Sequence, residues 1–361
     1  MARELILHIG HYKTGTTALQ VFLDRNRALL AAQGLHYATA PVLFSKHSAL
    51  AFSLLREAGV TELMHNFSKP ETATALWQAL FDEARALPDG EALLASSEEL
   101  IRLAAHPAAF DLLRAEVATA PDLRFRVVAY LRAPQDHLHS WYNQLIKMGA
   151  NVGGFAATVR AQMEPVHWDY ALALRPWIEL FGAEALVLRQ FRSELRKGDA
   201  LYSEFLEALG YAVPVLSEVP DGDPNPRLDG RLLPYKRALN RVSLRQRLRE
   251  QMLSLATEGL EAEDAGEPRL DAETLRQQSE AGIALAAALP GASLDAEAML
   301  KALPDLTEGP VERMEATIVL LASEIARLRG HVAMLSGRLD LLENTPAEPD
   351  ESRSANGDDA A

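Results

Sequence analysis

The sequence predicts an α/β protein: a three-layer α/β/α domain with a central parallel sheet, followed by a C-terminal helical coiled coil. Apolar runs of strand length occupy residues 5–9, 92–95 and 125–131, and the first and last of them lead directly into amphipathic helical patterns. A near-continuous apolar strand is typical of a parallel sheet that helices cover on both faces. A heptad repeat near the C-terminus predicts the coiled coil.

The first strand leads into the run HIGHYKTGTT at residues 8–17. An amphipathic helical pattern then extends over residues 18–30, and Gly34 suits its C-cap. Gly10 and Gly15 permit a tight loop whose backbone N–H groups point inward. A phosphate or sulfate group fits such a loop at a helix N-terminus. Further donors are the side chains of Lys13, Thr14, Thr16 and Thr17. The alternative is an ordinary glycine-containing turn with a solvated lysine.

The spacing in this loop differs from that of a Walker A loop, in which lysine follows the second glycine directly. Here Lys13 stands two residues before Gly15, and Thr16 follows that glycine. The KTGTT arrangement resembles the 5′-phosphosulfate-binding loop of sulfotransferases that use 3′-phosphoadenosine 5′-phosphosulfate (PAPS), especially the carbohydrate-modifying and bacterial members. The resemblance implies a fold like that of P-loop nucleoside kinases, PAPS as co-substrate, and no metal. It assigns the 5′ end of PAPS to Lys13, Thr14, Gly15, Thr16 and Thr17.

A second segment, LRAPQDHLHSWYNQ at residues 131–144, resembles the 3′-phosphate-binding segment of the same family. In that family an arginine after a strand and a serine eight positions later hold the adenosine 3′-phosphate, and Arg132 and Ser140 have this spacing. Pro134 suits the first position of the helix that carries the serine. A guanidinium can bind two phosphate oxygens while a hydroxyl donates a third hydrogen bond. The alternative is an ion-paired arginine and an unrelated surface serine.

The rest of the resemblance is one of layout. Residues 170–210 read as a helix, a strand at residues 185–188, a polar stretch and another helix, an order common in these sulfotransferases. The resemblance covers roughly residues 1–290, and its specific parts are the two phosphate loops.

Sulfuryl transfer to a hydroxyl requires a general base near the ends of the strands. Glu98 is the first candidate, because the polar run at residues 96–99 follows the short strand at residues 92–95, at the end where open α/β sheets bind ligands. The alternative is that this run caps the next helix. His47 is the second candidate, with a packing histidine as its alternative. Lys13 is the expected electrostatic stabiliser of the departing phosphate.

The composition excludes several classes of protein. The 361 residues, 48% of them hydrophobic, suffice for one large domain and an appendage. Without cysteine there are no disulfides and no thiolate metal sites. No apolar run approaches the ~20 residues that a membrane span needs, and the first strand begins too close to Met1 for a signal peptide to precede it. We therefore expect a soluble, cytoplasmic protein.

The charge distribution is uneven. A formal net charge of -14 argues against a general nucleic-acid binder. Residues 231–249 nevertheless contain seven basic and no acidic residues, with apolar residues at helical spacing. This segment is either the solvated face of a helix or a basic wall for the 3′-phosphate or an anionic acceptor, with Arg231, Lys236 and Arg237 as its first candidates.

The heptad repeat predicts a homodimer through residues 311–343. The apolar residues at alternating spacings of three and four are Val311, Met314, Ile318, Leu321, Ile325, Leu328, Val332, Leu335, Leu339 and Leu342. Branched residues at a and mostly leucine at d favour a parallel two-stranded coiled coil. In that register Glu324 faces Arg329 of a partner and Arg338 faces Glu343, so both pairs attract. The alternative is that the apolar stripe docks on the chain's own domain.

The sequence thus predicts four parts: a sulfotransferase-like domain at residues 1–290, a linker at 291–310, the coiled coil at 311–343 and a disordered acidic tail at 344–361. The expected reaction moves a sulfuryl group from PAPS to a hydroxyl or amine, with a saccharide or glycoconjugate favoured by analogy. Residues 39–75 and 149–170 are the expected acceptor walls, but their composition names no ligand. Two alternatives stay open: a P-loop-type kinase, which needs lysine directly after the second loop glycine and an acidic magnesium ligand, and an inactive oligomeric scaffold.

Overall fold

The structure of the protein is a computed structural model. It describes residues 3–40, 44–61, 70–215, 217–220, 227–258, 273–301 and 325–339, together with residues 42, 63, 67 and 322. The chain forms two compact units, of which the first comprises residues 1–230 and 265–309 and the second residues 231–264 and 310–361. The expected tail at residues 344–361, part of the expected linker and most of the expected heptads before residue 325 lie outside the described residues.

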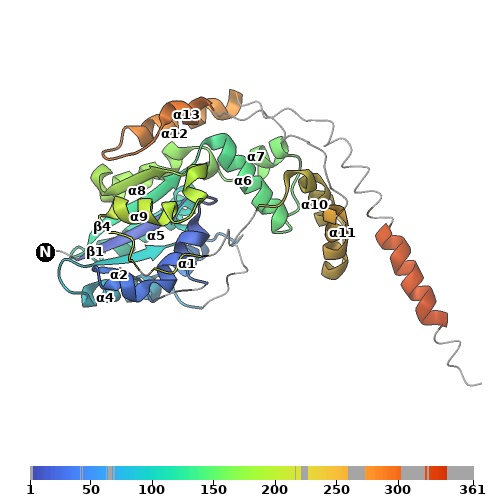
Figure 1. The fold of residues 1–361 in the computed structure, drawn as a ribbon, viewed down its shortest axis with the longest axis horizontal. Coiled ribbons are helices and arrows are strands. Elements are labelled where there is room, and N and C mark those ends of the chain that lie inside the picture. The colour runs from blue at the N-terminus through green and yellow to red at the C-terminus, as the bar shows by residue number, and fades with distance from the viewer. Residues whose placement is uncertain are drawn as a thin grey trace, which may run out of the picture. The chain divides into compact units, whose positions relative to one another are not determined.

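The first unit is built on a five-stranded parallel sheet, so the predicted parallel sheet is confirmed (Figure 1). Its order is β2-β3-β1-β4-β5. The strands are β1 (Glu4–Gly10), β2 (Leu35–Tyr37), β3 (Ala92–Ser96), β4 (Arg124–Leu131) and β5 (Leu186–Gln190). The central strands consist mainly of buried apolar residues, because helices cover the sheet on both sides. In the strand order, β2 and β3 lie on one side of β1, and β4 and β5 lie on the other. The chain therefore goes one way along the sheet after β1 and the other way after β3. In open α/β sheets with such a change of direction, ligands bind at the carboxyl ends of the strands.

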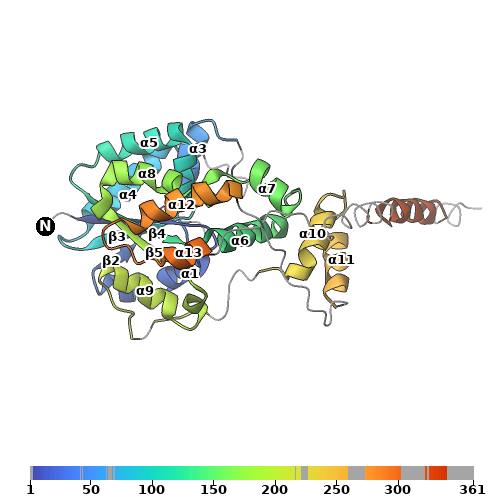
Figure 2. The ribbon, with the colours of Figure 1, turned by 90° about the horizontal axis from the view of Figure 1, so that it is seen from above.

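Two layers of helices enclose the sheet (Figure 2). One layer contains α1 (Thr16–Arg25), α2 (Arg27–Ala31) and α9 (Ala200–Leu209). The other contains α3 (Ser48–Glu57), α4 (Ala73–Ala86), α5 (Pro107–Ala118) and α8 (Tyr170–Phe181). Phe22 of α1 and Phe205 of α9 pack with Ile6 and Tyr130 of the sheet in one buried cluster. Such burial is the main source of stability for a domain of this kind.

Further helices extend these layers. They are α6 (Pro134–Lys147), which directly follows β4, α7 (Phe155–Gln162), α12 (Glu273–Ala287) and α13 (Ala296–Lys301). Helix α12 packs along α8, and α13 packs against α12. Short 3₁₀ helices lie at Leu100–Ala105 (η2), Pro165–His167 (η3), Ala183–Ala185 (η4), Ser193–Arg196 (η5) and Gly230–Leu232 (η6).

The single helix expected over residues 18–30 is divided in two, so that expectation was wrong. Helix α1 ends at Arg25, and α2 begins at Arg27. The side-chain amide of Asn26 donates to the carbonyls of Phe22 and Glu218, and its oxygen accepts the backbone N–H of Glu218. Asparagine is suited to this break because its side chain replaces backbone partners. Gly34 then turns the chain toward β2 with a φ of +82°.

The second unit contains α10 (Leu233–Asn240), α11 (Gln246–Glu258) and a helical segment at residues 325–339. The basic segment predicted to be helical is therefore helical, apart from a break between α10 and α11. A small apolar cluster joins Leu239 and Val242 to Ala322, with Ala326 packed against it. The a and d side chains of residues 325–339 are between 43% and 62% exposed: Ile325, Leu328, Val332, Leu335 and Leu339.

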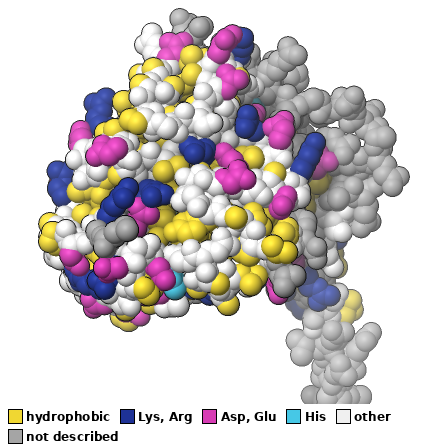
Figure 3. All heavy atoms as spheres, turned by 60° about the vertical axis from the view of Figure 1, so that its left-hand side comes forward, with side chains coloured by type: hydrophobic (Ala, Val, Ile, Leu, Met, Phe, Trp, Pro, Cys, Tyr) yellow, Lys and Arg dark blue, Asp and Glu magenta, His cyan; other side chains and the backbone are white. Residues whose placement is uncertain are grey.

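The surface carries charges of both signs. On the face drawn in Figure 3, acidic and basic side chains lie interspersed among hydrophobic ones. Among the described residues, none of the helices combines the length and the apolar character that a membrane crossing requires.

Candidate active site

Three connections leave neighbouring strands at one edge of the sheet. The chain passes from β1 into the glycine loop, from β3 into residues 97–99 and from β4 into Arg132. Because β1 pairs in parallel with both β3 and β4, with His8 opposite Ser96 and Gly10 opposite Ala129, these connections start at the same edge. The sheet therefore brings Lys13, Glu98 and Arg132 to its carboxyl end, where the sequence analysis placed them.

The glycine loop lies directly against Glu98. Gly10 has a φ of +93°, and a Cβ atom there would lie 2.9 Å from both Cα and Cβ of Glu98. Gly15 has a φ of +80°, and its Cβ would lie 2.7 Å from the side chain of Leu201. Both positions therefore need glycine, for backbone conformation and for space. The close approach at Gly10 couples the position of the loop to that of Glu98.

Helix α1 presents its N-terminus to this loop. Its N-cap is Gly15, which supplies no side-chain cap, so the first N–H groups of the helix keep their capacity to bind an anion. Thr16 is the first residue of the helix and is buried. The hydroxyl of Thr14 donates to the carbonyl oxygen of His11 at 2.5 Å, which fixes the loop. Of the sequence-predicted threonines, Thr14 therefore holds the backbone, while Thr16 and Thr17 open the helix.

Lys13 crosses from the loop to α6. It has a left-handed φ of 61°, a conformation that costs a residue other than glycine free energy and often occurs at functional sites. Its Nζ donates to Oε1 of Gln144 at 3.1 Å. Ser140 lies one turn before Gln144 and so shares its face of α6. Lys13 and Arg132 both act electrostatically on His137 of α6, which lowers the pKa of that buried histidine beyond the effect of burial alone.

Arg132 and Ser140 are buried donors with unused capacity. Arg132 is only 9% exposed and pairs with Asp136 at 3.5 Å through Nη2. Its Nη1 and the hydroxyl of Ser140, which is 1% exposed, have no hydrogen-bond partner among the described residues. Burial and the neighbouring Arg196 and Arg227 lower the pKa of Arg132 from its ordinary value, whereas Asp136 opposes them. Unpaired buried donors beside several guanidinium groups favour an anionic ligand.

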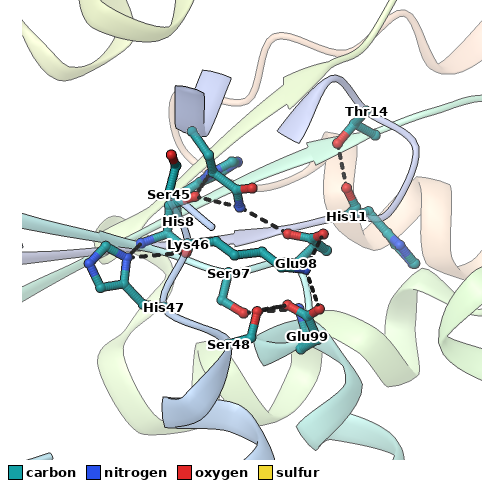
Figure 4. A network of polar contacts seen from close by, with 12 residues as sticks. His8, His11, Thr14, Ser45, Lys46, His47, Ser48, Ser97, Glu98 and Glu99 are labelled. Atoms are coloured by element: carbon teal, nitrogen blue, oxygen red, sulfur yellow. Dashed lines mark hydrogen bonds and ion pairs between the residues drawn. The ribbon is translucent and has the colours of Figure 1, made fainter. Parts of the chain in front are cut away.

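Glu98 and Glu99 share one lysine (Figure 4). Nζ of Lys46 lies 3.1 Å from Oε1 of Glu98 and 2.7 Å from Oε1 of Glu99. The amide of Gln20 donates to the other oxygen of Glu98 at 2.9 Å. Burial by itself would raise the pKa of Glu98, but Lys46 and Gln20 outweigh it and hold that pKa below its usual value. Glu98 is therefore a carboxylate at neutral pH.

His47 directly follows Lys46 in the chain and lies inside the protein. It is fully buried, and its Nε2 lies 2.9 Å from the carbonyl oxygen of Ala38. Its Nδ1 accepts the backbone N–H of Ser96 at 3.1 Å. Burial lowers the pKa of His47 from its ordinary value. Both ring nitrogens thus bond the backbone, an arrangement that ties the segment before α3 to the end of β3.

Three buried histidines from the loop, α6 and η3 lie close together: His11, His137 and His167. Nε2 of His137 lies 2.9 Å from Nδ1 of His167, and Nε2 of His11 donates to the carbonyl of Val166 at 2.7 Å. The ring nitrogens of the three histidines approach within 4.8 Å of one another, a separation that could admit a metal ion. Both nitrogens of His11 are already bonded, however, because its Nδ1 accepts the N–H of Tyr12 at 2.8 Å. The cluster therefore fits a structural support of the loop, with burial lowering the pKa of His11 to about 4.

Sequence reasoning missed Lys46 and Gln20. Lys46 is 52 residues from Glu98 along the chain and Gln20 is 78 residues from it, so no local spacing indicated either contact. The available signal was that Lys46 stands next to His47 and Gln20 falls on the first predicted helix. Neither residue type is unusual at such a place.

No protein-family model matches the chain, and a search of curated proteins finds no match. Among solved structures, the chain is similar to a sulfotransferase from Alicyclobacillus acidocaldarius, with a TM-score of 0.38 and 16% sequence identity over 78% of this chain and 96% of that one. A likeness at this level says nothing about the chemistry of the site.

Proposed function

We propose that the protein is a PAPS-dependent sulfotransferase that moves a sulfuryl group to a hydroxyl or amine acceptor. The observation that carries the proposal is the buried pair formed by Arg132 Nη1 and Ser140 Oγ, whose donors have no partner among the described residues. They lie by the same helix that Lys13 reaches from the glycine loop. Two donor groups at one sheet edge suit a nucleotide with an anionic group at each end. Orphaned buried donors are what a bound 3′-phosphate would satisfy.

In this proposal the two ends of PAPS have separate binding groups. The 5′-phosphosulfate contacts the loop and the N-terminus of α1 through Lys13, Thr14, Gly15, Thr16 and Thr17. The 3′-phosphate contacts Arg132 and Ser140. Arg196 and Arg227, which act electrostatically on Arg132, add positive charge around the same group. No metal is needed, because these cations neutralise the phosphates.

The reaction needs one cation and one base. PAPS supplies the sulfuryl group, and its phosphate oxygen gains negative charge as the bond to sulfur breaks. Lys13 stabilises that charge; removing one preorganised donor of this kind typically costs about 3 kcal/mol. Glu98 takes the proton of the acceptor hydroxyl as its oxygen bonds to sulfur. The products are the sulfated acceptor and adenosine 3′,5′-bisphosphate.

Glu98 is favoured over His47 as the base. Glu98 is ionised and keeps 8% exposure at the end of β3, whereas His47 is fully buried and both of its ring nitrogens face backbone groups. A base must reach the acceptor proton directly or through one water molecule. His47 remains the second candidate because it directly follows Lys46, whose Nζ contacts Glu98.

A saccharide or glycoconjugate is the favoured acceptor, on the strength of the loop's resemblance to carbohydrate sulfotransferases. Residues 39–75 and 149–170, parts of which lie outside the described residues, are the proposed acceptor walls. Lipid, antibiotic and peptide acceptors are the other classes to test. A screen with labelled PAPS and these acceptor classes tests the proposal. Transfer should fall about 100-fold in Lys13→Ala and should be strongly reduced in Glu98→Gln. Full activity in Glu98→Gln would instead make His47 the leading base.

Two alternatives have less support. A P-loop-type kinase needs an acidic magnesium ligand, but both carboxylates at the end of β3 already bind Lys46. An inactive scaffold has no use for the buried donors of Arg132 and Ser140. A kinase would prefer ATP with magnesium to adenosine 3′,5′-bisphosphate, and a scaffold would bind neither of these nucleotides.

We also propose that two chains pair through residues 311–343. In the helix at residues 325–339 the a and d side chains are exposed, while Ala322 and Ala326, at positions e and b, make the apolar contacts within the second unit. The face that meets α10 and α11 is therefore a different one from the heptad seam. A partner's Arg329 would face Glu324 across the seam and favour a second copy of this chain as the occupant.

A further inference from the structure

Lys46 is held in place by its neighbours on both sides. Phe44 and Ser45, directly before it, have left-handed φ values of 50° and 62°. Residues other than glycine keep this conformation only where their surroundings impose it, and such strain is often found at functional sites. The hydroxyl of Tyr37 donates to the carbonyl of Ser45 at 2.6 Å. The hydroxyl of Ser45 donates to Oδ2 of Asp24 at 2.7 Å.

The next residue fixes the other side of the lysine. The backbone N–H of His47 donates to the carbonyl oxygen of Ser96 at 2.9 Å. Lys46 is thereby attached to the last residue of β3, two positions before Glu98. Its Nζ points to the two carboxylates, as Figure 4 shows. The fold thus directs the buried ammonium group of Lys46 toward the candidate base, Glu98.

The two carboxylates differ in how completely they are bound. Glu99 is fully buried, and besides Lys46 it accepts the hydroxyls of Ser48 at 2.8 Å and Ser97 at 2.6 Å. Glu98 has Lys46 and Gln20 as its side-chain donors and keeps some exposure. Glu99 thus accepts three side-chain donors, from Lys46, Ser48 and Ser97, whereas Glu98 accepts two. Glu98 is therefore the carboxylate that can receive a proton.

The charges of this trio suit a single proton transfer. Lys46 contributes one positive charge, and Glu98 and Glu99 one negative charge each, so the trio has a net charge of -1. One proton on Glu98 makes it neutral. A lysine that faced Glu98 alone would weaken it as a base more strongly, because it would not be shared.

We propose that Lys46 is the positioning residue of the general base. It holds the Glu98 carboxylate ionised and oriented, and Glu99 is the fixed counter-ion that limits how strongly Lys46 weakens Glu98 as a base. This inference rests on the proposed function. In the step, the acceptor O–H bond breaks and its proton moves to Glu98. The acceptor oxygen bonds to sulfur, and the bond between sulfur and the phosphate oxygen breaks.

Other titratable groups face Glu98 as well. His8, Tyr12 and Tyr37 interact with its charge electrostatically. Burial raises the pKa of both tyrosines above the ordinary value, and it lowers that of His8 to about 4. All three are therefore neutral between pH 5 and 8. Among the described residues, Lys46 is the cation paired with Glu98, and Glu99 is the acidic residue next to it in the chain.

The test compares the pH dependence of kcat/KM in variants of the full chain. Lys46→Met removes the cation and should shift the acid limb of this pH profile to higher pH by about 1 to 3 units, whereas Lys46→Arg should leave the limb in place. Glu99→Gln should move the limb in the opposite direction, because Lys46 then acts on Glu98 alone. A general loss of structure would not shift the acid limb in opposite directions in these two variants. An acid limb in Lys46→Met that coincides with the wild-type limb would overturn the proposal.

Two additions keep the test decisive. If Lys46→Met does not fold, the double variant Lys46→Met/Glu99→Gln is compared with Glu99→Gln. Its acid limb should lie at higher pH than that of Glu99→Gln, because these two variants differ only in Lys46. The pKa of Glu98 can also be measured without any acceptor, by NMR titration of ¹³C-labelled glutamate carboxyl groups, assigned with Glu98→Gln. A raised pKa in the lysine variant supports the role of Lys46 even if no sulfate transfer is found, in which case the proposed function alone fails. An unchanged pKa overturns the inference whatever the enzyme does.

Discussion

Replacing Gly10 with alanine tests the contact between the glycine loop and Glu98. The new Cβ would lie 2.9 Å from Cα and Cβ of Glu98, and Cα is a backbone atom that moves only with the end of β3. Two costs add. A left-handed conformation costs an alanine about 1–2 kcal/mol, and overpacking in a well-packed region costs about 1–3 kcal/mol. We therefore expect Gly10→Ala to lower the free energy of unfolding by about 2–5 kcal/mol, as measured by urea denaturation.

Gly90 provides the matched control. Its φ of +88° is close to that of Gly10, but no heavy atom lies within 4 Å of the position of its Cβ. Gly90→Ala should therefore cost only the conformational part, about 1–2 kcal/mol. It should also leave the proposed sulfate transfer unchanged, while Gly10→Ala should impair it because the loop and Glu98 are displaced together. Equal losses of stability in the two variants would refute the close approach at Gly10.

Three further predictions concern the heptad seam, acid stability and the phosphate pair. If the chain forms the proposed dimer, Leu335→Ser should convert it to monomer in sedimentation analysis, whereas Met334→Ser, at an equally exposed (53%) position off the seam, should not. Dimers in both variants would exclude the seam as the interface. Burial lowers the pKa values of His8 and His11 to about 4, so the unfolded chain binds protons more readily, and stability present above pH 6.5 is lost as the pH falls toward 4. Urea denaturation at pH 5 should show a loss of about 2 kcal/mol for each histidine, and a pH-independent stability between 7.5 and 5 would contradict this. In calorimetry, Ser140→Ala should weaken the binding of adenosine 3′,5′-bisphosphate about 10- to 100-fold and leave the binding of adenosine 5′-monophosphate unchanged. The variant should not destabilise the free protein, since the hydroxyl has no partner among the described residues. Equal weakening of the binding of both nucleotides would argue against a 3′-phosphate contact.

The sequence predicted the sheet well because its central strands are continuous apolar runs. The strands β1, β3 and β4 were placed to within a residue or two, since burial on both faces leaves a local compositional signal. The single helix expected over residues 18–30 failed for a non-local reason. Asn26 breaks it with the help of Glu218, 192 residues away in the chain. The heptad pattern predicted a helix that the structure describes at residues 325–339, while its pairing stays a prediction.

Single residues of the site could be predicted from the sequence, but the contacts between them could not. The spacing of Arg132 and Ser140 indicated a pair of donors, and strand ends indicated Glu98. What the spacing could not reveal was that burial leaves both donors without a protein partner among the described residues. Lys46 could not be found either, because a lysine far away in the chain gives no local sign of the carboxylate it will meet. Such long-range ion pairs depend on tertiary packing alone.

Calorimetry with adenosine 3′,5′-bisphosphate tests the central claim most directly, that two donor groups hold the two ends of one nucleotide. We expect tight binding without magnesium, a large loss of affinity in Arg132→Ala and in Lys13→Ala, and little preference for ATP with magnesium. Binding that is absent in the wild-type protein, or that survives Arg132→Ala undiminished, would contradict the claim.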